Sequence, residues 1–596
     1  MPLPVGRCEP TMLRVAPPGK DVLIRATCRG AAPQGDQITD RLNFSYLEAG
    51  YTEVLSHREV WRATDGKNMT DRSRRFYPIV VALVVLLSGA AAGALFGERT
   101  VPEEETQLMM RASRVVNLLV EWLPTEQDPA DIVYDGIAGM LEVLDPHANF
   151  LDPRTFDKMR ARQEGSFYGV GIIISRRDGK ITVIAPMAGT PAAAKGLRTG
   201  DIITAVSDQN TEDMSLDDVV DLVRGPEGTD VHLTIARPGL SDTFAVDITR
   251  TKIPQTTVRY AFMVRPEVGY VRLSEFTSRS TREVREAIER LRTEGMQDLI
   301  LDLRNNPGGS LDAAIGVADP FLAKGDLVVT TGGRTRSRHS TLSAPGNGET
   351  FEGTVIVLVN EGSASASEIV AGAIQDHDRG LVIGEVTWGK GLVQTVFTVR
   401  DAGLALTTAR YYTPSGRSIQ RDYDSFIDYI THRNGADGSN GDTIYATDAG
   451  RTVLGGGGIM PDVTVSNRTL SENLARLYGN SAFFRFAIDV LKDVPEEDQA
   501  AMARGFSVDG PVLESFFDFV KENEILPPED LDALKAEEQD LTDVKLGILV
   551  EVLNATLGLD AGYQAALETD EQFLATIKHL PDGQDFWATW KAANLG

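Results

Sequence analysis

The stretch Val355-Ile-Val-Leu-Val-Asn-Glu-Gly-Ser-Ala-Ser-Ala-Ser-Glu-Ile369 passes from an apolar run through a glycine turn into a helical pattern. The run Val355 to Val359 predicts a buried strand, and the helix is expected to begin at Ser365. Lys390 follows 25 residues later, between two glycines in Thr387-Trp-Gly-Lys-Gly-Leu-Val-Gln394. A serine at a strand-to-helix turn beside a desolvated lysine is one way to activate a hydroxyl group without histidine.

Both residues also have ordinary structural interpretations. Ser365-Ala-Ser-Glu368 matches a capping box, with Ser363 as a competing N-cap, and a lone lysine in a turn is usually solvated. An unperturbed lysine has a pKa near ~10.4, so burial must lower the pKa of Lys390 before it can act as a base near neutral pH. The nearest charged residues in the sequence are Glu385 and Arg400, so the local sequence permits burial of the amine.

A second glycine turn lies upstream, in Leu299-Ile-Leu-Asp-Leu-Arg-Asn-Asn-Pro-Gly-Gly309. It joins an apolar strand to a predicted helix over Ser310 to Leu322. Paired glycines leave backbone N–H groups free to face a ligand, and a helix N-terminus adds partial positive charge. This arrangement suits an oxyanion hole, although an ordinary turn with glycine at positive φ produces the same pattern.

These three segments, in this order, resemble the carboxyl-terminal processing (tail-specific) serine proteases. The likeness covers roughly residues 100 to 468. It continues through four shorter segments, Gly136-Ile-Ala-Gly-Met-Leu141, Leu144-Asp-Pro146, Tyr412-Thr-Pro-Ser-Gly-Arg-Ser-Ile-Gln420 and Gly458-Ile-Met-Pro-Asp462. The resemblance implies an α/β multidomain protein whose core has the crotonase/ClpP-like spiral fold, and it implies an endopeptidase.

The resemblance also implies a role for each matching residue. Ser365 matches the family nucleophile, Lys390 the general base, and Gln394 the residue that orients the lysine. On a regular strand, residues 390 and 394 lie ~13 Å apart at about 3.3 Å per residue. We therefore expect a bend or a turn of helix between them. The expected oxyanion donors are the backbone N–H groups of Ala366 and of Gly308 or Gly309.

A histidine-based mechanism is the alternative. His377 lies twelve residues after Ser365 on the same predicted helix. That spacing is about 18 Å along the axis at 1.5 Å per residue, which is too far for proton transfer. The other histidines sit in no comparable motif.

Residues 165–252 resemble a PDZ domain, and a helix is predicted within them over Leu216 to Val223. Such domains bind a peptide by adding it as a strand to a sheet edge, and they hold its terminal carboxylate on backbone N–H groups. The resemblance implies substrates that are held by free, apolar C-termini. Taken alone, the glycines here would indicate a β-bulge or strand kink. The residues that match the family's carboxylate loop are Tyr168, Gly169, Val170 and Gly171.

Composition narrows the possible functions. The chain has 596 residues, enough for several domains, and 42% hydrophobic content. A net charge of −27 argues against nucleic-acid binding, which needs a basic surface. The two cysteines, Cys8 and Cys28, precede the first predicted domain, and no zinc pattern occurs. No cofactor or metal is therefore implied.

The N-terminal part contains a possible membrane segment. Arg72-Ser-Arg-Arg75 precedes 22 uncharged residues, Phe76 to Gly97. About 20 apolar residues can span a bilayer, and preceding positive charges direct the remainder outward. The length favours an anchor over a cleaved signal sequence cut near Ala90 to Ala94. We therefore expect a protein of the bacterial cell envelope, on the periplasmic side, anchored in the inner membrane by residues 76–97.

The remaining segments carry no assigned chemistry. Residues 1–68 are interpreted as a non-native or disordered leader, with Met69 as the natural start. The helical spacing of Leu108, Val115, Leu118, Leu119 and Trp122 predicts core packing. The C-terminal helices are predicted to share one apolar face, formed by Leu474, Leu477, Phe483, Phe486, Ile488 and Leu491. A substrate gate, a dimer contact and an adaptor site are equally open as the function of these helices.

The expected layout is a leader at 1–68, an export signal or membrane anchor at 69–97, an N-terminal helical region at 98–164, the PDZ domain at 165–252, a serine protease core at 253–468 with a surface insertion at 421–457, and a helical extension at 469–596.

The expected partners are protein substrates bound by their C-termini, the membrane through the N-terminal segment, and a second copy in a homo-oligomer. One rival is a catalytically silent PDZ scaffold that only binds C-termini, and the intact serine, lysine and glutamine argue against it. A second rival is a crotonase-type acyl-CoA enzyme, which the PDZ module and the export signal oppose.

Overall fold

The computed structural model describes residues 103–122, 125, 128–335, 339–422 and 443–594. The predicted leader at 1–68 and the predicted anchor at 76–97 lie outside these residues. Within the described ranges, no helix combines the length and the apolar character needed to cross a bilayer.

Six strands form the central sheet, in the order β10-β11-β12-β15-β16-β21. The β10-β11 pair is antiparallel, and the other neighbouring pairs are parallel. Every residue of the central strand at Val355–Val359 is buried, as expected where helices cover both faces of a parallel sheet. The strands are β10 (Val258–Arg265), β11 (Val268–Leu273), β12 (Asp298–Asp302), β15 (Val355–Val359), β16 (Leu381–Gly384) and β21 (Val463–Thr464).

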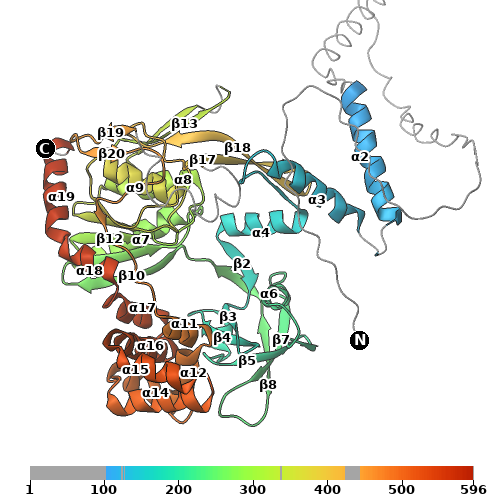
Figure 1. The fold of residues 1–596 in the computed structure, drawn as a ribbon, viewed down its shortest axis with the longest axis vertical. Helices are drawn as coiled ribbons and strands as arrows, with labels where there is room; N and C mark the ends of the chain where they lie inside the picture. The colour runs from blue at the N-terminus through green and yellow to red at the C-terminus, as the bar shows by residue number, and fades with distance from the viewer. Residues whose placement is uncertain (1–102, 123–124, 126–127, 336–338, 423–442, 595–596) are drawn as a thin grey trace, which may run out of the picture. The chain divides into compact units, whose positions relative to one another are not determined.

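Two helical layers cover this sheet (Figure 1). Leu299 and Leu301 point into a core shared with the first layer, whereas Ile300 between them packs against the second. This alternation follows from the two-residue period of a strand. The first layer is α7 (Ser280–Thr293), α8 (Leu311–Ala318) and α9 (Ala366–Asp376), and the second is α17 (Leu559–Leu567), α18 (Glu571–Lys578) and α19 (Leu580–Asn594). The helix predicted over Ser310 to Leu322 is α8, capped by Ser310 and followed by a 3-10 turn at Asp319–Phe321.

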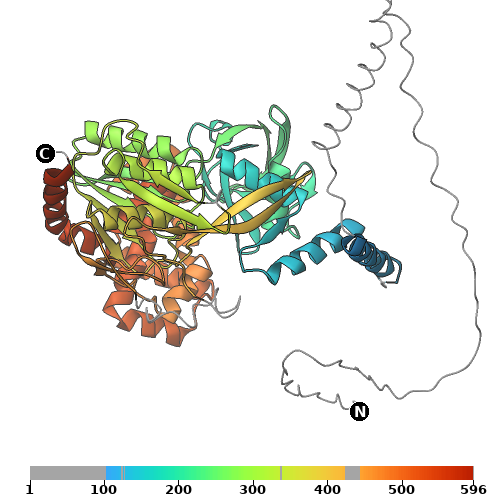
Figure 2. The ribbon, with the colours of Figure 1, turned by 90° about the horizontal axis from the view of Figure 1, so that it is seen from above.

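A second sheet contains a long ribbon that extends from the core beside α3 and α4 (Figure 2). Its order is β1-β18-β13-β14, and β17 also pairs with β18. The strands are β1 (Asn149–Leu151), β13 (Leu327–Gly333), β14 (Ser340–Ser343), β17 (Leu392–Val399) and β18 (Ala402–Tyr412).

The third sheet lies in the predicted PDZ region and has its own apolar core. Its strands are β3 (Ile172–Arg177), β4 (Lys180–Pro186), β5 (Ile202–Val206), β6 (Gln209–Asn210), β7 (Asp230–Ala236) and β8 (Phe244–Thr249), with helices α5 (Pro191–Ala194) and α6 (Leu216–Val223). A two-stranded ribbon, β2 (Ser166–Gly169) with β9 (Thr251–Pro254), precedes and follows this sheet in the chain. The helix expected at Leu216 to Val223 is therefore present.

The C-terminal extension forms a helical bundle before it reaches the central sheet. Its helices are α11 (Glu472–Gly479), α12 (Ala482–Leu491), α13 (Glu496–Arg504), α14 (Gly510–Glu522), α15 (Pro528–Ala536) and α16 (Glu538–Thr556). The predicted apolar face is confirmed, because most of its members are buried in one cluster with Phe516 and Phe517. The bundle also contacts the third sheet, where Arg177 Nη1 donates to Ser481 Oγ at 2.9 Å.

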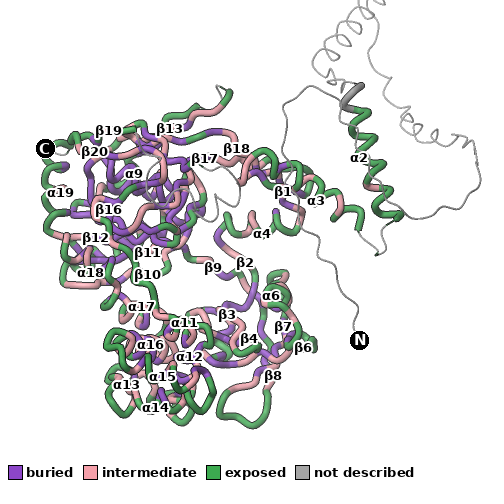
Figure 3. The backbone as a smooth tube through the Cα atoms, in the orientation of Figure 1, coloured by how far each residue is buried: buried purple, intermediate pink, exposed green. Residues whose placement is uncertain are grey.

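One expectation is wrong. The helix α2 (Glu103–Trp122) forms, with α3 (Pro129–Glu142) and α4 (Pro153–Glu164) after it, but its apolar residues are not core. Leu108 is 61% exposed and Trp122 is 77% exposed, and most of α2 is coloured as exposed in Figure 3. Helical periodicity identifies an apolar face but not what covers it. Within the described part of the surface insertion predicted at 421–457, β19 (Ile444–Ala446) and β20 (Thr452–Leu454) form a hairpin. Arg451 joins that hairpin to Asp378 and Asp462 through ion pairs.

Candidate active site

Ser365 lies at the sharp turn between β15 and α9. Its backbone has φ 55° and ψ −112°. Residues other than glycine seldom adopt such a conformation, and those that do cluster at functional sites. Ser365 is half-buried, and Ala366 begins the helix immediately after it. The predicted strand, turn and helix are therefore present, with the serine in a strained position.

Lys390 lies in the segment between β16 and β17, and its Nζ donates to Gln394 Oε1 at 3.1 Å. The two residues meet because β17 begins only at Leu392 and its register shifts between Val393 and Gln394. The expected bend is thus a β-irregularity and not a turn of helix. Burial lowers the pKa of Lys390 below its ordinary value of 10.5, and the negative charge of Glu368 partly opposes that shift.

The N-terminal region supplies the next contact outward from the lysine. Gln394 Nε2 donates to the backbone carbonyl of His147 at 2.6 Å. That carbonyl is held in place because Asp145 Oδ1 accepts from His147 N at 2.8 Å and from Thr407 Oγ1 at 3.1 Å. Burial, aided by the positive charge of Lys390, lowers the pKa of His147 to about 4. His147 is therefore neutral near pH 7 and adds no charge beside the lysine.

His377 is placed away from this cluster, as the helical spacing predicts. It caps the C-terminal end of α9, opposite the end that carries Ser365. Its ring contacts Asp448 Oδ2 and the carbonyl of Leu327, both at 2.7 Å.

A buried carboxylate connects the serine segment to the lysine segment. Glu368 Oε2 accepts from the backbone N–H of Ser365 at 2.7 Å and from that of Lys390 at 2.9 Å. The two nitrogens are thus no farther apart than the sum of these distances. Glu368 Oε1 accepts from Gly389 N at 2.7 Å and from Thr387 Oγ1 at 2.6 Å. Glu368 is fully buried, and this burial raises its pKa even though these four donors act in the opposite direction.

Tyr411 ties the same two segments from a different strand. Its hydroxyl lies 3.1 Å from the carbonyl oxygen of Ser365 and also contacts the carbonyl oxygen of Lys390. Among the described contacts, none joins Ser365 Oγ to Lys390 Nζ directly. The structure therefore brings the serine, lysine and glutamine segments together through Glu368 and Tyr411.

The glycine turn after β12 lies directly against the start of α9. A β-carbon built on Gly308 would lie 2.7 Å from Ser365 Cβ and 2.9 Å from Ala366 N. The Gly308 N–H donates to Asn306 Oδ1 at 2.9 Å. Within the described part of the chain, neither Gly309 N nor Ala366 N has a hydrogen-bond acceptor. The space in front of the Ala366 N–H thus depends on glycine at position 308.

The PDZ region contains a groove of about 310 Å³ between β3 and α6. Gly169, Val170 and Gly171 line it, together with the side chains of Val220 and Val223. The carbonyl oxygens of Val170 and Gly171 accept hydrogen bonds from within the domain. Their N–H groups have no acceptor among the described residues. Tyr168, the fourth predicted residue, is 41% exposed and does not line the groove.

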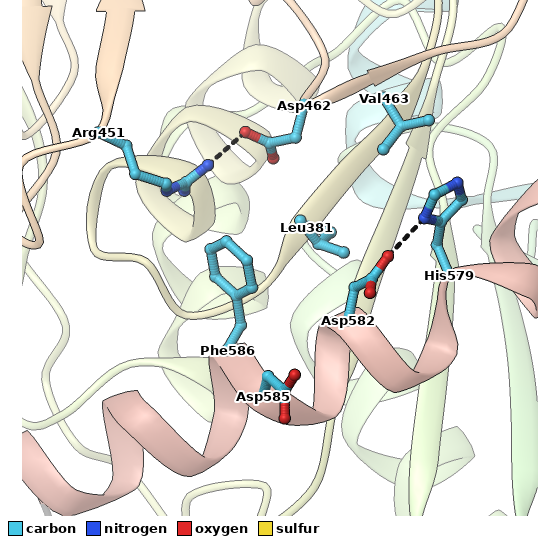
Figure 4. Close-up of a pocket in the computed structure, with 8 residues that line it drawn as sticks. All are labelled: Leu381, Arg451, Asp462, Val463, His579, Asp582, Asp585 and Phe586. Atoms are coloured by element: carbon cyan, nitrogen blue, oxygen red, sulfur yellow. Dashed lines mark hydrogen bonds and ion pairs between the residues drawn. The ribbon is translucent and has the colours of Figure 1, made fainter.

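A separate hollow of about 470 Å³ lies between α19 and the edge of the central sheet (Figure 4). Leu381, Asp462 and Phe586 line it, and His579 Nδ1 contacts Asp582 Oδ2 at 2.6 Å. It contains none of the predicted site residues. Among the described residues, no group of three or more His, Cys, Asp or Glu side chains could hold a metal ion.

Sequence reasoning missed two contributors to this site. The sequence shows Glu368 only as the partner in a capping box, because that pattern is local. The carbonyl of His147 has no side-chain signal at all. The glycines on either side of Lys390 are a signal in the sequence that the backbone of this segment can approach another group closely. In the structure, the Gly389 N–H donates to the Glu368 carboxylate.

Two parts of the chain match known protein families. Residues 267–425 match peptidase family S41, and residues 182–237 match a PDZ domain. A carboxy-terminal-processing protease of Bartonella bacilliformis is 42% identical over 301 residues, which cover 50% of this chain and 69% of the relative. A carboxyl-terminal-processing protease of Synechocystis is 35% identical over 380 residues, covering 59% of this chain and 87% of the relative.

A solved structure, the photosystem II D1 C-terminal processing protease, shares 32% identity over 59% of this chain and 85% of its own, with a TM-score of 0.32. The predicted family and fold class are confirmed, with a mixed α/β protease core, a PDZ domain and C-terminal helices. The chain therefore belongs to peptidase family S41, the carboxyl-terminal processing serine proteases.

Proposed function

We propose that this protease captures substrates by their C-termini in the PDZ groove and cleaves them with Ser365 and Lys390. The observation that carries the proposal is the shared acceptor, since one oxygen of Glu368 binds the backbone N–H groups of both residues. Ser365 and Lys390, which are 25 positions apart in the sequence, are thus held side by side. Burial lowers the pKa of Lys390.

The chemistry needs a proton to move from the serine to the lysine. Ser365 Oγ attacks the peptide carbonyl carbon while neutral Lys390 Nζ accepts the Oγ proton, which requires the two atoms to approach to roughly 2.6–3.2 Å. Lys390 then gives that proton to the leaving amine as the C–N bond breaks. Water attacks the acyl-enzyme by the same route in reverse and restores the Ser365 hydroxyl. Gln394, held by the carbonyl of His147, orients Lys390 as its acceptor.

The negative charge on the tetrahedral oxygen is held by backbone donors. We assign the Ala366 N–H and the Gly309 N–H, because Gly308 N already donates to Asn306. Preorganised donors of this kind supply a large share of catalysis because they need no reorganisation during the reaction. The start of α9 adds its partial positive charge at the same place.

The PDZ groove suits the end of an apolar chain. Val220 and Val223 line it, and the free N–H groups of Val170 and Gly171 are placed to receive a carboxylate. We assign Gly169 to the same loop, whereas the exposed Tyr168 lies at its edge. The export of the protein to the periplasmic side, and its anchoring by residues 76–97, are proposed from the sequence pattern alone.

The nucleophile is tested by Ser365→Ala. We expect hydrolysis of a protein with an apolar C-terminus to fall by about 10⁴-fold or more, while binding of a peptide with that C-terminus is unchanged, because the groove lies in another domain. Ser340→Ala, at an exposed serine, is the control and should keep full activity. Unchanged hydrolysis in Ser365→Ala would refute the nucleophile, and a wild-type protein that binds but never cleaves would support a PDZ scaffold.

The base is tested by the pH dependence of kcat/KM. Only neutral Lys390 accepts a proton, so the rate should rise with pH and level off above the pKa of Lys390, with a midpoint below 10.5. The charge of Glu368 raises that pKa, so Glu368→Gln should move the midpoint to lower pH. A rate that does not change with pH, or a midpoint that stays in place in Glu368→Gln, contradicts this assignment.

The carboxylate of Glu368 is tested by the same substitution at saturating substrate. The amide that replaces the Glu368 carboxylate keeps one acceptor oxygen. Its two N–H donors face backbone N–H groups and the Thr387 hydroxyl, which donate hydrogen bonds to the carboxylate in the wild type. We expect kcat to fall roughly 100-fold, as for a misplacement of reacting groups by about 1 Å. Glu361→Gln, at an exposed glutamate on the same turn, is the matched control. Equal kcat for the two variants would show that Glu368 does not position the site.

A further inference from the structure

The oxyanion loop of the proposed site, residues 303–309, is anchored at its start by Arg304. This residue is only 6% exposed, and its Nε and Nη2 donate to Asp302 at the end of β12, with the Nη2 contact at 2.7 Å. Burial alone would raise the pKa of Asp302, but the charges of Arg304 and Arg272 hold it below its ordinary value. The arginine and the aspartate are therefore a buried ion pair within the core itself.

The remaining part of the guanidinium group is held by the C-terminal extension. Arg304 Nη1 donates to Asp570 Oδ2 at 2.7 Å and to Gln572 Oε1 at 3.1 Å. Both partners lie at the start of α18, more than 260 residues further along the chain. Gln572 is fully buried and donates in turn to the carbonyl of Val465 at 2.9 Å. Three side chains thus surround one planar group whose donors have fixed directions.

The two carboxylate oxygens of Asp570 make different contacts. Oδ1 caps α18 by accepting from the N–H of Phe573 at 2.9 Å, while Oδ2 binds Arg304. Without a carboxylate between them, the positive end of the helix would face a positive guanidinium group. The position of Asp570 therefore ties the orientation of Arg304 to the docking of α18 on the sheet.

Among the described residues, those of the core hold the rest of the loop. Asn305 N donates to Asn360 Oδ1 at 2.8 Å, and Asn306 Nδ2 donates to the carbonyl of Leu273 at 2.8 Å. Asn306 O accepts from Ala364 N at 3.0 Å, which fixes the loop against the turn that carries Ser365. A rotation of the chain at Arg304 would therefore be transmitted toward Gly309 by a short segment with few internal degrees of freedom.

We propose that Asp570 and Gln572 of the C-terminal extension are positioning residues for the oxyanion loop and act through Arg304. The extension is then part of the catalytic apparatus and not only a cover for the sheet. This inference rests on the proposed function, because it gives the loop after β12 the role of an oxyanion hole. The extension also contacts the PDZ region at Ser481, so one continuous helical segment touches both the domain that binds substrate and the loop that serves the reaction.

The test is Asp570→Asn in the full-length protein. Asparagine is as good an N-cap as aspartate, so α18 should keep its cap while Arg304 loses its charged partner. We expect kcat to fall roughly 10- to 100-fold with KM changed by less than about twofold. The affinity of a peptide boronic acid that reacts with Ser365 should fall in parallel, since its tetrahedral adduct uses the oxyanion donors. Binding of a C-terminal peptide to the PDZ groove should be unchanged.

The matched control is Asp509→Asn. Asp509 caps α14 in the same extension by accepting from Val512 N at 3.1 Å, and within the described residues it forms no ion pair. This variant should retain wild-type kcat. Arg304→Lys keeps a positive charge toward Asp302 but cannot bind Asp302 and Asp570 at once. In that background, Asp570→Asn should lower kcat by less than about a further twofold, because both substitutions remove the same interaction.

The outcomes separate this inference from the proposed function. If wild type cleaves and Ser365→Ala does not, but Asp570→Asn keeps the kcat of Asp509→Asn, the positioning role is refuted while the protease assignment stands. A loss confined to the unfolding temperature, with normal kcat at 25 °C, refutes it as well. If Asp570→Asn does not fold, Gln572→Met removes the neighbouring contact and should lower kcat with unchanged KM, and wild-type kcat in that variant overturns the proposal.

Discussion

The carboxylate of Glu368 is the interaction on which the proposed site depends. It is fully buried, and burying an ionised group costs several kcal/mol unless hydrogen bonds compensate. Four donors surround it, namely the backbone N–H groups of Ser365, Gly389 and Lys390 and the hydroxyl of Thr387. Removing the carboxylate would leave these donors buried without an acceptor. The chain therefore satisfies this part of its interior by bringing the segments of Ser365 and Lys390 together, so stability and the alignment of the proposed site have the same cause.

The fold explains how distant segments reach this carboxylate. Parallel strands present their carboxyl ends at one edge of a sheet, so the turns after β12 and β15 meet there. The ribbon of β17 and β18 then brings Gln394 against the carbonyl of His147, and the C-terminal extension reaches the same edge through Arg304. Three regions that the linear order separates thus meet at one edge of the sheet.

Much of the site could be predicted from the sequence, because its motifs are local. The turn at Ser365, the glycine turn after β12 and the helix at Leu216–Val223 follow from short patterns of apolar, glycine and capping residues. The function of Glu368 could not be predicted, since a capping pattern does not show that the carboxylate also reaches Lys390. The apolar face of α2 follows from its helical spacing, but its exposure does not, because periodicity carries no information about what covers a face. The contact of Asp570 with Arg304 could not be predicted either, because Asp570 matches an ordinary N-cap in the sequence.

The most direct measurement is a high-resolution crystal structure of the protein after reaction with a peptidyl phosphonate. The account predicts phosphorus bonded to Ser365 Oγ, its oxygen within about 3 Å of the N–H groups of Ala366 and Gly309, and Lys390 Nζ within hydrogen-bond distance of Oγ. Glu368 should still accept from the backbone N–H groups of both Ser365 and Lys390. An adduct in which the Glu368 carboxylate has turned away, or in which Lys390 Nζ points into solvent, would contradict the account.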